Sequence, residues 1–176
     1  MTAAGLLLTP GFGGSRTSPA LVAVEKAVAP LPVLRVDLPK TAAPAIAQVR
    51  AQAEAFAASL GVGTESVVLG GRSFGGRMCS MAVAEGLPAA GLVLLSYPLH
   101  PPGKPTTLRI AHLPDIRVPV LAVSGTTDPF GSPAELTEHL AAIPGPVPTV
   151  FLPGPHLPTS QAAVAAAVRD WLGTLA

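Results

Sequence analysis

Short apolar runs alternate with helical patterns along the whole chain, and this alternation limits the choice of fold more than any other feature. We expect strands at residues 5–9, 33–37, 66–70, 91–96, 118–124 and 147–152. These runs are apolar on both faces, which is typical of strands buried inside a parallel sheet. The sequence therefore predicts an α/β fold with a mostly parallel central sheet of about six strands and helices on both of its faces.

The segments between the strands carry helix signals. Ser18-Pro19 and Ser132-Pro133 each offer an N-cap followed by proline, and Glu135 completes a capping box. A second helix places apolar residues three or four positions apart and ends near Gly61, and a last helix is expected at about 159–172. The proline-rich segment 97–117 has little periodicity, so we expect a loop with at most one short helix and no cap domain.

Length and composition limit the function classes. A chain of 176 residues, 49% hydrophobic and 12% charged, is expected to form one domain over residues 1–176 with a substantial core. The formal charge is +1 and no basic run occurs, so nucleic acid is not an expected partner. The expected partner is a small-molecule substrate.

Other features bear on location and cofactors. No apolar stretch approaches the roughly 18 residues of a membrane span, and the first residues lack the positive charge of a signal peptide. We therefore expect a cytoplasmic protein that does not enter a membrane. The lone Cys79 excludes an internal disulfide, and no metal-ligand spacing is present, so neither a metal nor another cofactor is expected.

The segment 66–80, SVVLGGRSFGGRMCS, has the pattern of a serine nucleophile elbow. An apolar strand leads into Ser73 and a helix leaves it. Such a turn is so sharp that side chains two positions before and after the serine would clash, which explains glycine at Gly71 and Gly75. The sequence therefore predicts an exposed, reactive hydroxyl on Ser73.

Two further groups follow later strands. Asp128 comes after the fifth expected strand and His156 after the sixth. The carboxyl ends of parallel strands meet at one edge of a sheet, where ligands collect. The order Ser, Asp, His is that of the α/β-hydrolase triad, in which the imidazole activates the serine and the carboxylate orients the imidazole.

Each of these residues also has a simpler interpretation. Ser73 could be a turn serine, Asp128 could start an Asp-Pro turn, and His156 could be an ordinary loop histidine. The strand, elbow and helix around Ser73, and the positions of the other two after strands, favour the catalytic roles. His100, in the proline-rich segment, is a candidate pocket residue.

An acyl-transfer site also needs donors for the oxyanion. The backbone N–H of Phe74 follows the serine at a helix start, and the glycine-rich loop after the first strand could bring the N–H of Phe12 close to it. The alternative for this loop is a flexible turn.

The chain resembles the α/β-hydrolases over its whole length. Within that superfamily, GGRSFGGRMCSM, YPLHPPGKP and HLPDIRVPVLAVSGTTDPFG look like the small lidless family of testis-expressed protein 30 and relatives of a chromatin-complex subunit. The likeness to dienelactone hydrolases is more distant. The resemblance implies a triad of Ser73, Asp128 and His156, with Phe12 and Phe74 as oxyanion donors.

Two departures from the family pattern stand out. The chain has Pro10-Gly11 where hydrolases usually have His-Gly. It also begins at what would be the third strand of the full fold, so we expect the leading antiparallel strands to be missing and the strand at 33–37 to lie at an open edge. Two copies of the chain could pair through that edge.

We interpret the chain as a serine esterase or related acyl hydrolase that works through an acyl-enzyme. Two alternatives remain: a catalytically silent binding or scaffold module that keeps the elbow as architecture, and a hydrolase of lactones or C–C bonds.

Overall fold

Six parallel strands form the central sheet of the computed structural model, which describes residues 2–175. The strands are β1 (Gly5–Thr9), β2 (Val33–Arg35), β3 (Val67–Arg72), β4 (Gly91–Leu95), β5 (Val120–Gly125) and β6 (Thr149–Leu152). Their order across the sheet is β2-β1-β3-β4-β5-β6, and each neighbouring pair is parallel. The structure confirms the predicted fold class.

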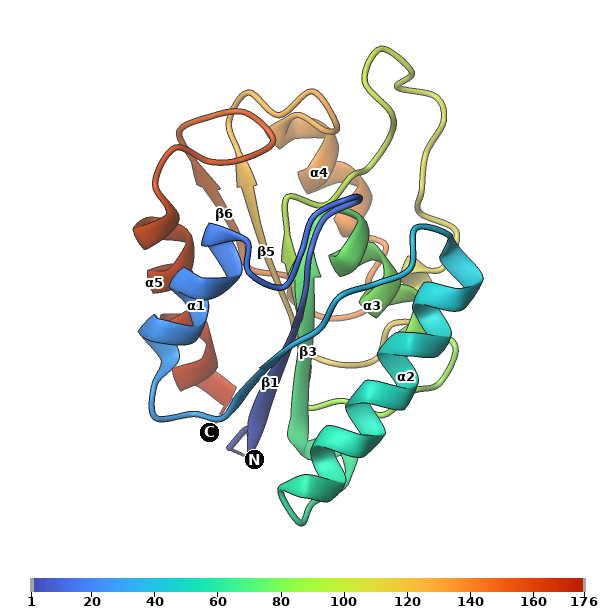
Figure 1. Ribbon diagram of the computed structural model, residues 1–176. Helices are drawn as coiled ribbons and strands as arrows, with labels where there is room; N and C mark the ends of the chain where they lie inside the picture. The colour runs from blue at the N-terminus through green and yellow to red at the C-terminus, as the bar shows by residue number, and fades with distance from the viewer. Residues whose placement is uncertain (1, 176) are drawn as a thin grey trace.

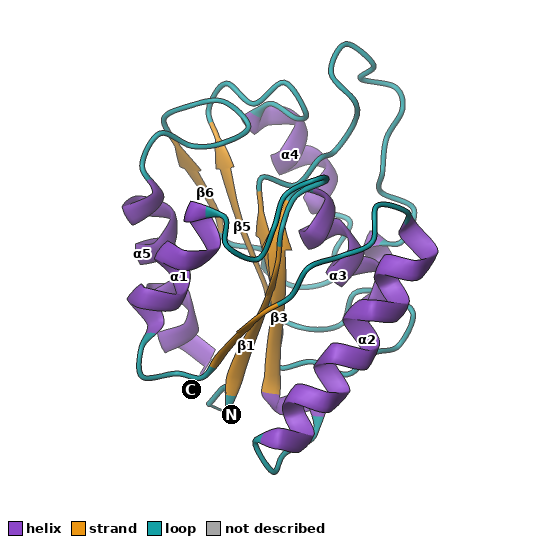
Figure 2. Ribbon diagram, viewed as in Figure 1, coloured by secondary structure: helices purple, strands orange, loops and turns teal. Residues whose placement is uncertain are grey.

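Helices cover both faces of the sheet (Figures 1 and 2). One face carries α1 (Pro19–Val28) and α5 (Gln161–Leu172), and the other carries α2 (Ala42–Ser59), α3 (Phe74–Ala84) and α4 (Pro133–Leu140). Short 3-10 helices span Thr64–Ser66, Leu113–Asp115 and Gly173–Leu175. No helix within residues 2–175 is long and apolar enough to cross a membrane.

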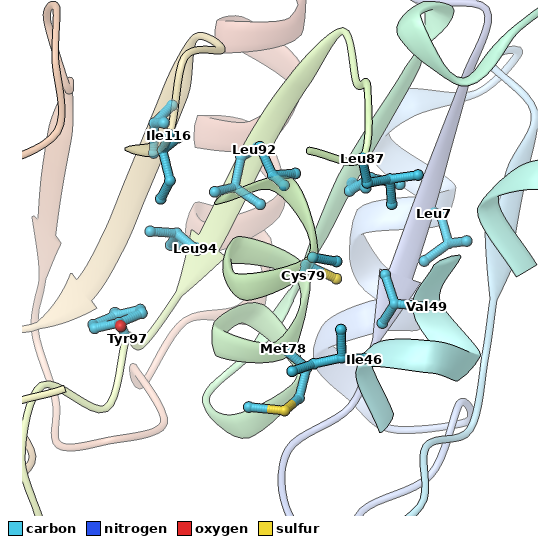
Figure 3. Packing of buried hydrophobic residues seen from close by; sticks show 14 of the residues in the cluster. Leu7, Ile46, Val49, Met78, Cys79, Leu87, Leu92, Leu94, Tyr97 and Ile116 are labelled. Atoms are coloured by element: carbon cyan, nitrogen blue, oxygen red, sulfur yellow. The ribbon is translucent and has the colours of Figure 1, made fainter. Parts of the chain in front are cut away.

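The alternation of side chains along each strand fills two cores. In β1, Leu7 packs toward α2 and α3, while Leu6 and Leu8 pack toward α1 and α5, and all three are fully buried. Figure 3 shows the first core, where Ile46 and Val49 of α2 lie near side chains of α3. Each such leucine contributes roughly 1.5–3 kcal/mol by leaving water, so the strands form a firm base for the loops at their ends.

The capping signals have different outcomes in the two helices that begin with Ser-Pro. At α4 the predicted capping box forms: Glu135 N donates to Ser132 Oγ at 3.3 Å, and Ser132 N donates to Glu135 Oε2 at 2.8 Å. At α1 the helix begins at Pro19 as predicted, but the Ser18 side chain makes no capping hydrogen bond.

Strand β3 is longer than predicted, and this affects the site. The apolar run suggested an end at residue 70, yet Gly71 pairs with Thr9 of β1 and Arg72 pairs with Leu95 of β4. Because β1 pairs with β3 as far as Gly71 and β4 pairs with it as far as Arg72, β3 leads directly into Ser73.

Strand β2 lies at the edge of the sheet, as predicted, but is shorter than the expected 33–37. It pairs with β1 only over Val33–Arg35. Pairing of two chains through this edge stays a prediction.

The connection between β4 and β5 packs against the body of the protein at both of its ends. Tyr97, Leu99, Leu113 and Ile116 are buried in the core next to α2, α3 and α4. Its middle projects from the top of the molecule as the yellow-green loop of Figure 1, and its helical content is the single turn Leu113–Asp115. The expectation of a loop with one short helix is therefore confirmed.

Candidate active site

Ser73 lies at the turn between β3 and α3 in a backbone conformation that L-residues rarely adopt. Its φ is 50° and its ψ is −118°. Such a conformation costs on the order of 1–3 kcal/mol and persists only where the surroundings hold it in place. Here Ser73 N donates to Leu95 O of β4 at 2.7 Å, and Arg77 N of α3 donates to Ser73 O at 3.0 Å. Strand and helix together therefore fix the serine.

The two elbow glycines lie against the end of β1. A side chain at Gly71 would collide with the hydroxyl and the carbonyl oxygen of Thr9. A side chain at Gly75 would collide with the Pro10 carbonyl oxygen and the Thr9 hydroxyl. The absence of side chains at both positions lets the turn pass close to the loop that carries Phe12.

The structure brings Ser73, His156 and Asp128 together in one hydrogen-bonded chain. His156 Nε2 lies 2.8 Å from Ser73 Oγ, and His156 Nδ1 lies 3.0 and 2.9 Å from the two carboxylate oxygens of Asp128. The three residues follow β3, β6 and β5, whose carboxyl ends lie at the same edge of the sheet. Residues 83 positions apart in sequence thus meet through the sheet topology.

The partners of Asp128 define the direction of these hydrogen bonds. The Asp128 side chain is fully buried, and its Oδ1 also accepts from Phe130 N at 2.8 Å. A buried carboxylate only accepts, so His156 Nδ1 carries a proton and donates it. His156 Nε2 is then free to accept from the Ser73 hydroxyl, which is the arrangement needed to remove the serine proton.

Phe130 packs directly on the imidazole of His156. The two rings are stacked with centroids 4.1 Å apart. Together with the Asp128 carboxylate, this aromatic ring restricts the imidazole to one orientation.

The residues predicted to supply the oxyanion donors, Phe12 and Phe74, are in side-chain contact and both line the cavity at Ser73. The rings of Phe12 and Phe74 make an edge contact with centroids 5.9 Å apart, although Phe12 comes from the loop after β1 and is 67% exposed. Within residues 2–175, neither the Phe12 N–H nor the Phe74 N–H donates to a protein atom. Both donors are therefore available to an oxygen placed at this elbow.

His100 takes a different place from the one expected of a pocket residue. It is buried, its Nδ1 lies 2.8 Å from Pro101 O, and its Nε2 lies 3.3 Å from Glu135 Oε1. The Ser132 hydrogen bonds and then His100 hold the pKa of Glu135 below its usual value. His100 thus connects the β4–β5 connection to the start of α4 and does not line the cavity beside Ser73.

That cavity has a volume of about 260 Å³. Three aromatic rings, one proline and two guanidinium groups surround the serine, and the lining residues are Phe12, Ser73, Phe74, Arg77, Pro98, Arg109 and Phe130. Sequence reasoning missed Arg77, Pro98, Arg109 and Phe130. Only Arg77 carried a usable signal, because it lies one helical turn after Ser73.

Other polar groups near the elbow have structural environments. Cys79 is fully buried, and burial raises the pKa of its thiol to about 12, so it is no second nucleophile. Burial lowers the pKa of Arg72, while the nearby Asp128 raises it. Among residues 2–175, no group of three His, Cys, Asp or Glu side chains could hold a metal ion.

Several solved structures share this fold. Est1E from Butyrivibrio proteoclasticus has a TM-score of 0.80 and 19% identity, over 99% of this chain and 89% of that one. The esterase domain of a Rhodothermus marinus protein has a TM-score of 0.74 and 18% identity, over 97% and 86% of the two chains. Dienelactone hydrolase from Anabaena variabilis has a TM-score of 0.71 and 22% identity, over 98% and 87%.

At these identities the structural likeness concerns the fold alone. A search of curated protein sequences finds no match. A family model described as an alpha/beta hydrolase domain, however, matches residues 4–155, which include Ser73 and Asp128 and end next to His156. This match covers most of the chain, and the protein therefore belongs to the alpha/beta hydrolase family.

Proposed function

We propose that the protein is a serine hydrolase that cleaves small esters or thioesters through an acyl-enzyme. The observation that carries this proposal is the hydrogen-bonded chain from Ser73 Oγ to His156 and from His156 to the buried Asp128 carboxylate. Side chains that only fill the core do not need a hydrogen-bonded chain, or relay, of this kind. The relay lets the imidazole remove the proton of the serine hydroxyl, which turns a weak nucleophile into a reactive one.

In the first half of the reaction, Ser73 Oγ attacks the substrate carbonyl carbon as His156 Nε2 takes the hydroxyl proton. The tetrahedral intermediate then collapses, the bond to the leaving oxygen or sulfur breaks, and His156 returns the proton to that leaving atom. In the second half, water attacks the acyl-enzyme with His156 again as the base, which releases the acid and restores Ser73. Asp128 stabilises the positive imidazole in each half.

The negative charge that develops on the carbonyl oxygen would be bound by the N–H groups of Phe12 and Phe74. Both are free of protein acceptors within the described residues, and their rings are in contact. Loss of one such donor typically lowers turnover by about 10²- to 10³-fold. The Pro10-Gly11 sequence does not prevent the binding of the oxyanion, since the donor is the N–H of Phe12, the residue after Gly11.

Two features favour an enzyme over a silent scaffold module. The strained backbone of Ser73 is maintained at an energetic cost, and the serine opens into a cavity of about 260 Å³. The fold similarity to both an esterase domain and a dienelactone hydrolase leaves the bond type to experiment. Membership of the narrower testis-expressed protein 30 family and a cytoplasmic location stay predictions.

A fluorophosphonate probe tests the proposal directly, since it reacts with activated serines. We expect the wild-type protein to be labelled at Ser73 and to hydrolyse p-nitrophenyl acetate. Ser73→Ala should lose the label and on the order of 10⁵- to 10⁶-fold in turnover while keeping its melting temperature, because one hydroxyl is removed and no core volume is lost. Ser59→Ala, at an exposed serine of α2, is the matched control.

Absence of labelling in a folded wild-type protein would favour the silent module. Equal ester hydrolysis by the wild type and Ser73→Ala would exclude Ser73 as the nucleophile. If Ser73 is labelled but simple esters are not cleaved, a panel of lactones and C–C bond substrates identifies the bond that is broken.

A further inference from the structure

Two arginines line the cavity beside Ser73, although most of its other walls are apolar. Arg77 lies on α3 one turn after the serine, and Arg109 comes from the connection between β4 and β5. The remaining lining residues are Ser73, three phenylalanines and one proline. Placing two positive charges against such walls is costly unless something compensates for them.

The protein itself supplies little compensation. Among residues 2–175, neither Arg77 nor Arg109 forms an ion pair with a carboxylate. Arg77 Nε is buried without a hydrogen-bond partner, and Arg109 Nη1 donates to the Pro98 carbonyl oxygen at 3.2 Å. A buried donor without a partner loses its hydration and gains nothing in return.

Tyr97 and His112, two titratable side chains that interact with Arg77, are neutral near pH 7. Burial raises the pKa of Tyr97 to about 12, so its phenol stays protonated. Burial, followed by the charge of Arg77, lowers the pKa of His112 to about 4. The carboxylate of Asp115 acts on His112 in the opposite direction but forms no ion pair with either arginine.

The two guanidinium groups also act on each other. Burial lowers the pKa of Arg109, and the charge of Arg77 lowers it further. Two like charges that are close enough to interact, with no carboxylate between them, create a positive potential within the cavity.

The position of the cavity relative to the relay shows which part of a substrate would meet these charges. The leaving atom must lie next to His156 Nε2 to receive its proton. The cavity is lined by Ser73, Phe12 and Phe74 but not by His156. Phe130, which stacks on His156, closes another side of the same cavity. The acyl part of a substrate, which stays attached to Ser73, would enter the cavity on the side of Phe12 and Phe74.

We propose that Arg77 and Arg109 form an anion subsite, and that the preferred substrates are esters or thioesters whose acyl part carries a carboxylate. This inference rests on the proposed serine hydrolase function and adds the substrate class. Guanidinium groups are planar forks of N–H donors that match a carboxylate, and such charge-assisted hydrogen bonds are about twice as strong as neutral ones. An acyl carboxylate would give the buried Arg77 donor its missing partner.

The test compares two esters that differ only in that charge. Monomethyl glutarate carries a free carboxylate on its acyl part, and dimethyl glutarate is its neutral analogue. Hydrolysis of both is followed by pH-stat titration. We expect wild-type kcat/KM to be at least tenfold higher for monomethyl glutarate.

Variants at the subsite should remove this preference. In Arg77→Met and Arg109→Met, the ratio of kcat/KM values for the charged and neutral esters should fall roughly 10- to 100-fold, as expected for the loss of a hydrogen bond to a charged group. Arg77→Lys should keep part of the preference, because it keeps the charge and loses the fork. Arg50→Met, on α2 and in another surface cavity, should leave the ratio unchanged.

A wild-type protein that cleaves dimethyl glutarate at least as well as monomethyl glutarate would overturn the subsite and leave the esterase proposal standing. If neither ester is cleaved and Ser73 is not labelled by the fluorophosphonate, the proposed function fails instead. Calorimetry with glutarate tests the subsite in that case: binding that is at least tenfold weaker in Arg77→Met or Arg109→Met supports it, and equal or absent binding in the wild type overturns it.

Discussion

At the scale of single residues, the Asp128 carboxylate has two distinct tasks. It accepts from Phe130 N, which holds its own loop, and it accepts from His156 Nδ1, which fixes the tautomer of the imidazole. The first task needs an oxygen acceptor, which an amide also has. The second needs negative charge when the imidazole becomes positive.

Replacement of Asp128 by asparagine should separate these tasks. We expect Asp128→Asn to fold and to bind substrate with a similar KM, while kcat for p-nitrophenyl acetate falls about 10⁴-fold, because the amide N–H of asparagine would face His156 Nδ1 and favour the wrong tautomer of the imidazole. Asp170→Asn, an exposed carboxylate of α5, is the control. A loss of less than tenfold in Asp128→Asn would exclude the relay described here.

The elbow glycines give a second prediction at this scale. A methyl group at Gly75 would collide with the Pro10 carbonyl oxygen and the Thr9 hydroxyl, so Gly75→Ala should cost about 1–3 kcal/mol in the free energy of unfolding and reduce turnover by displacing the Phe12 loop. Gly173→Ala, where an added methyl meets no atom within 4 Å, should leave both unchanged within about 0.5 kcal/mol. Urea unfolding and p-nitrophenyl acetate hydrolysis measure the two effects. Wild-type stability and turnover in Gly75→Ala would contradict the close approach.

Sequence reasoning worked at positions where local pattern and chain order agree. Ser73, Asp128 and His156 each follow an expected strand, which predicts their meeting at one edge of the sheet, and the structure brings these three side chains together. Arg77, Arg109 and Phe130 gave no comparable signal. They come from one face of α3 and from the loops after β4 and β5, and only the folded positions of these loops make them neighbours.

At the scale of elements, the β4–β5 connection is fastened to α3 through His112. The Ser80 hydroxyl donates to Arg77 O at 2.7 Å, so it accepts from His112 Nε2, which also lies 2.7 Å away. Burial, and then the charge of Arg77, lowers the pKa of His112 from the ordinary 6.5 to about 4. The folded state therefore favours a neutral imidazole at this position.

Stability should consequently fall in mild acid. The unfolded chain takes up a proton on His112 below about pH 6.5, whereas the folded chain does so only near pH 4, so the free energy of unfolding decreases as the pH falls between these values. Because this imidazole is only half-buried and partly screened by water, we expect a loss of about 1–2 kcal/mol. Urea unfolding at pH 7.5 and 5.0 measures it. His112→Asn should show a smaller difference between the two pH values, and an unchanged difference would exclude this contact as its source.

The elements themselves were largely predictable. Fully buried parallel strands read as continuous apolar runs, so all six were found, and the capping box located the start of α4. The apolar run predicts an end of β3 at residue 70, two residues too early, because Gly71 and Arg72 have no strand propensity of their own. They are extended because the ladders of β1 and β4 continue beside them, and those are contacts between distant parts of the chain.

At the scale of the whole molecule, the loops at the carboxyl end of the sheet form the site, and residues 2–175 include no separate cap over it. The β4–β5 connection contributes Pro98 and Arg109 to the cavity wall, but its helical content is a single turn. Its ends are anchored in the core through Tyr97, Leu99, Leu113 and Ile116. A segment held in this way is part of the wall and is not a lid that opens and closes.

This arrangement predicts which substrates the protein accepts. The cavity of about 260 Å³ is slightly below the usual range for a ligand pocket, roughly 300–1,000 Å³, so it suits a short acyl group and not the long chain of a fatty acid. Two arginines on its wall further disfavour an extended alkyl chain, because the chain would displace water from them without offering hydrogen bonds.

We expect kcat/KM for p-nitrophenyl acetate and butyrate to exceed that for the palmitate ester by at least tenfold. We also expect no rate increase when the substrate concentration passes its solubility limit, since the β4–β5 connection is anchored in the core and is not a lid that could open at an interface. Ser73→Ala measured in parallel supplies the background rate for each ester. A clear preference for palmitate would show that a deep apolar channel continues beyond Phe12, Phe74 and Phe130.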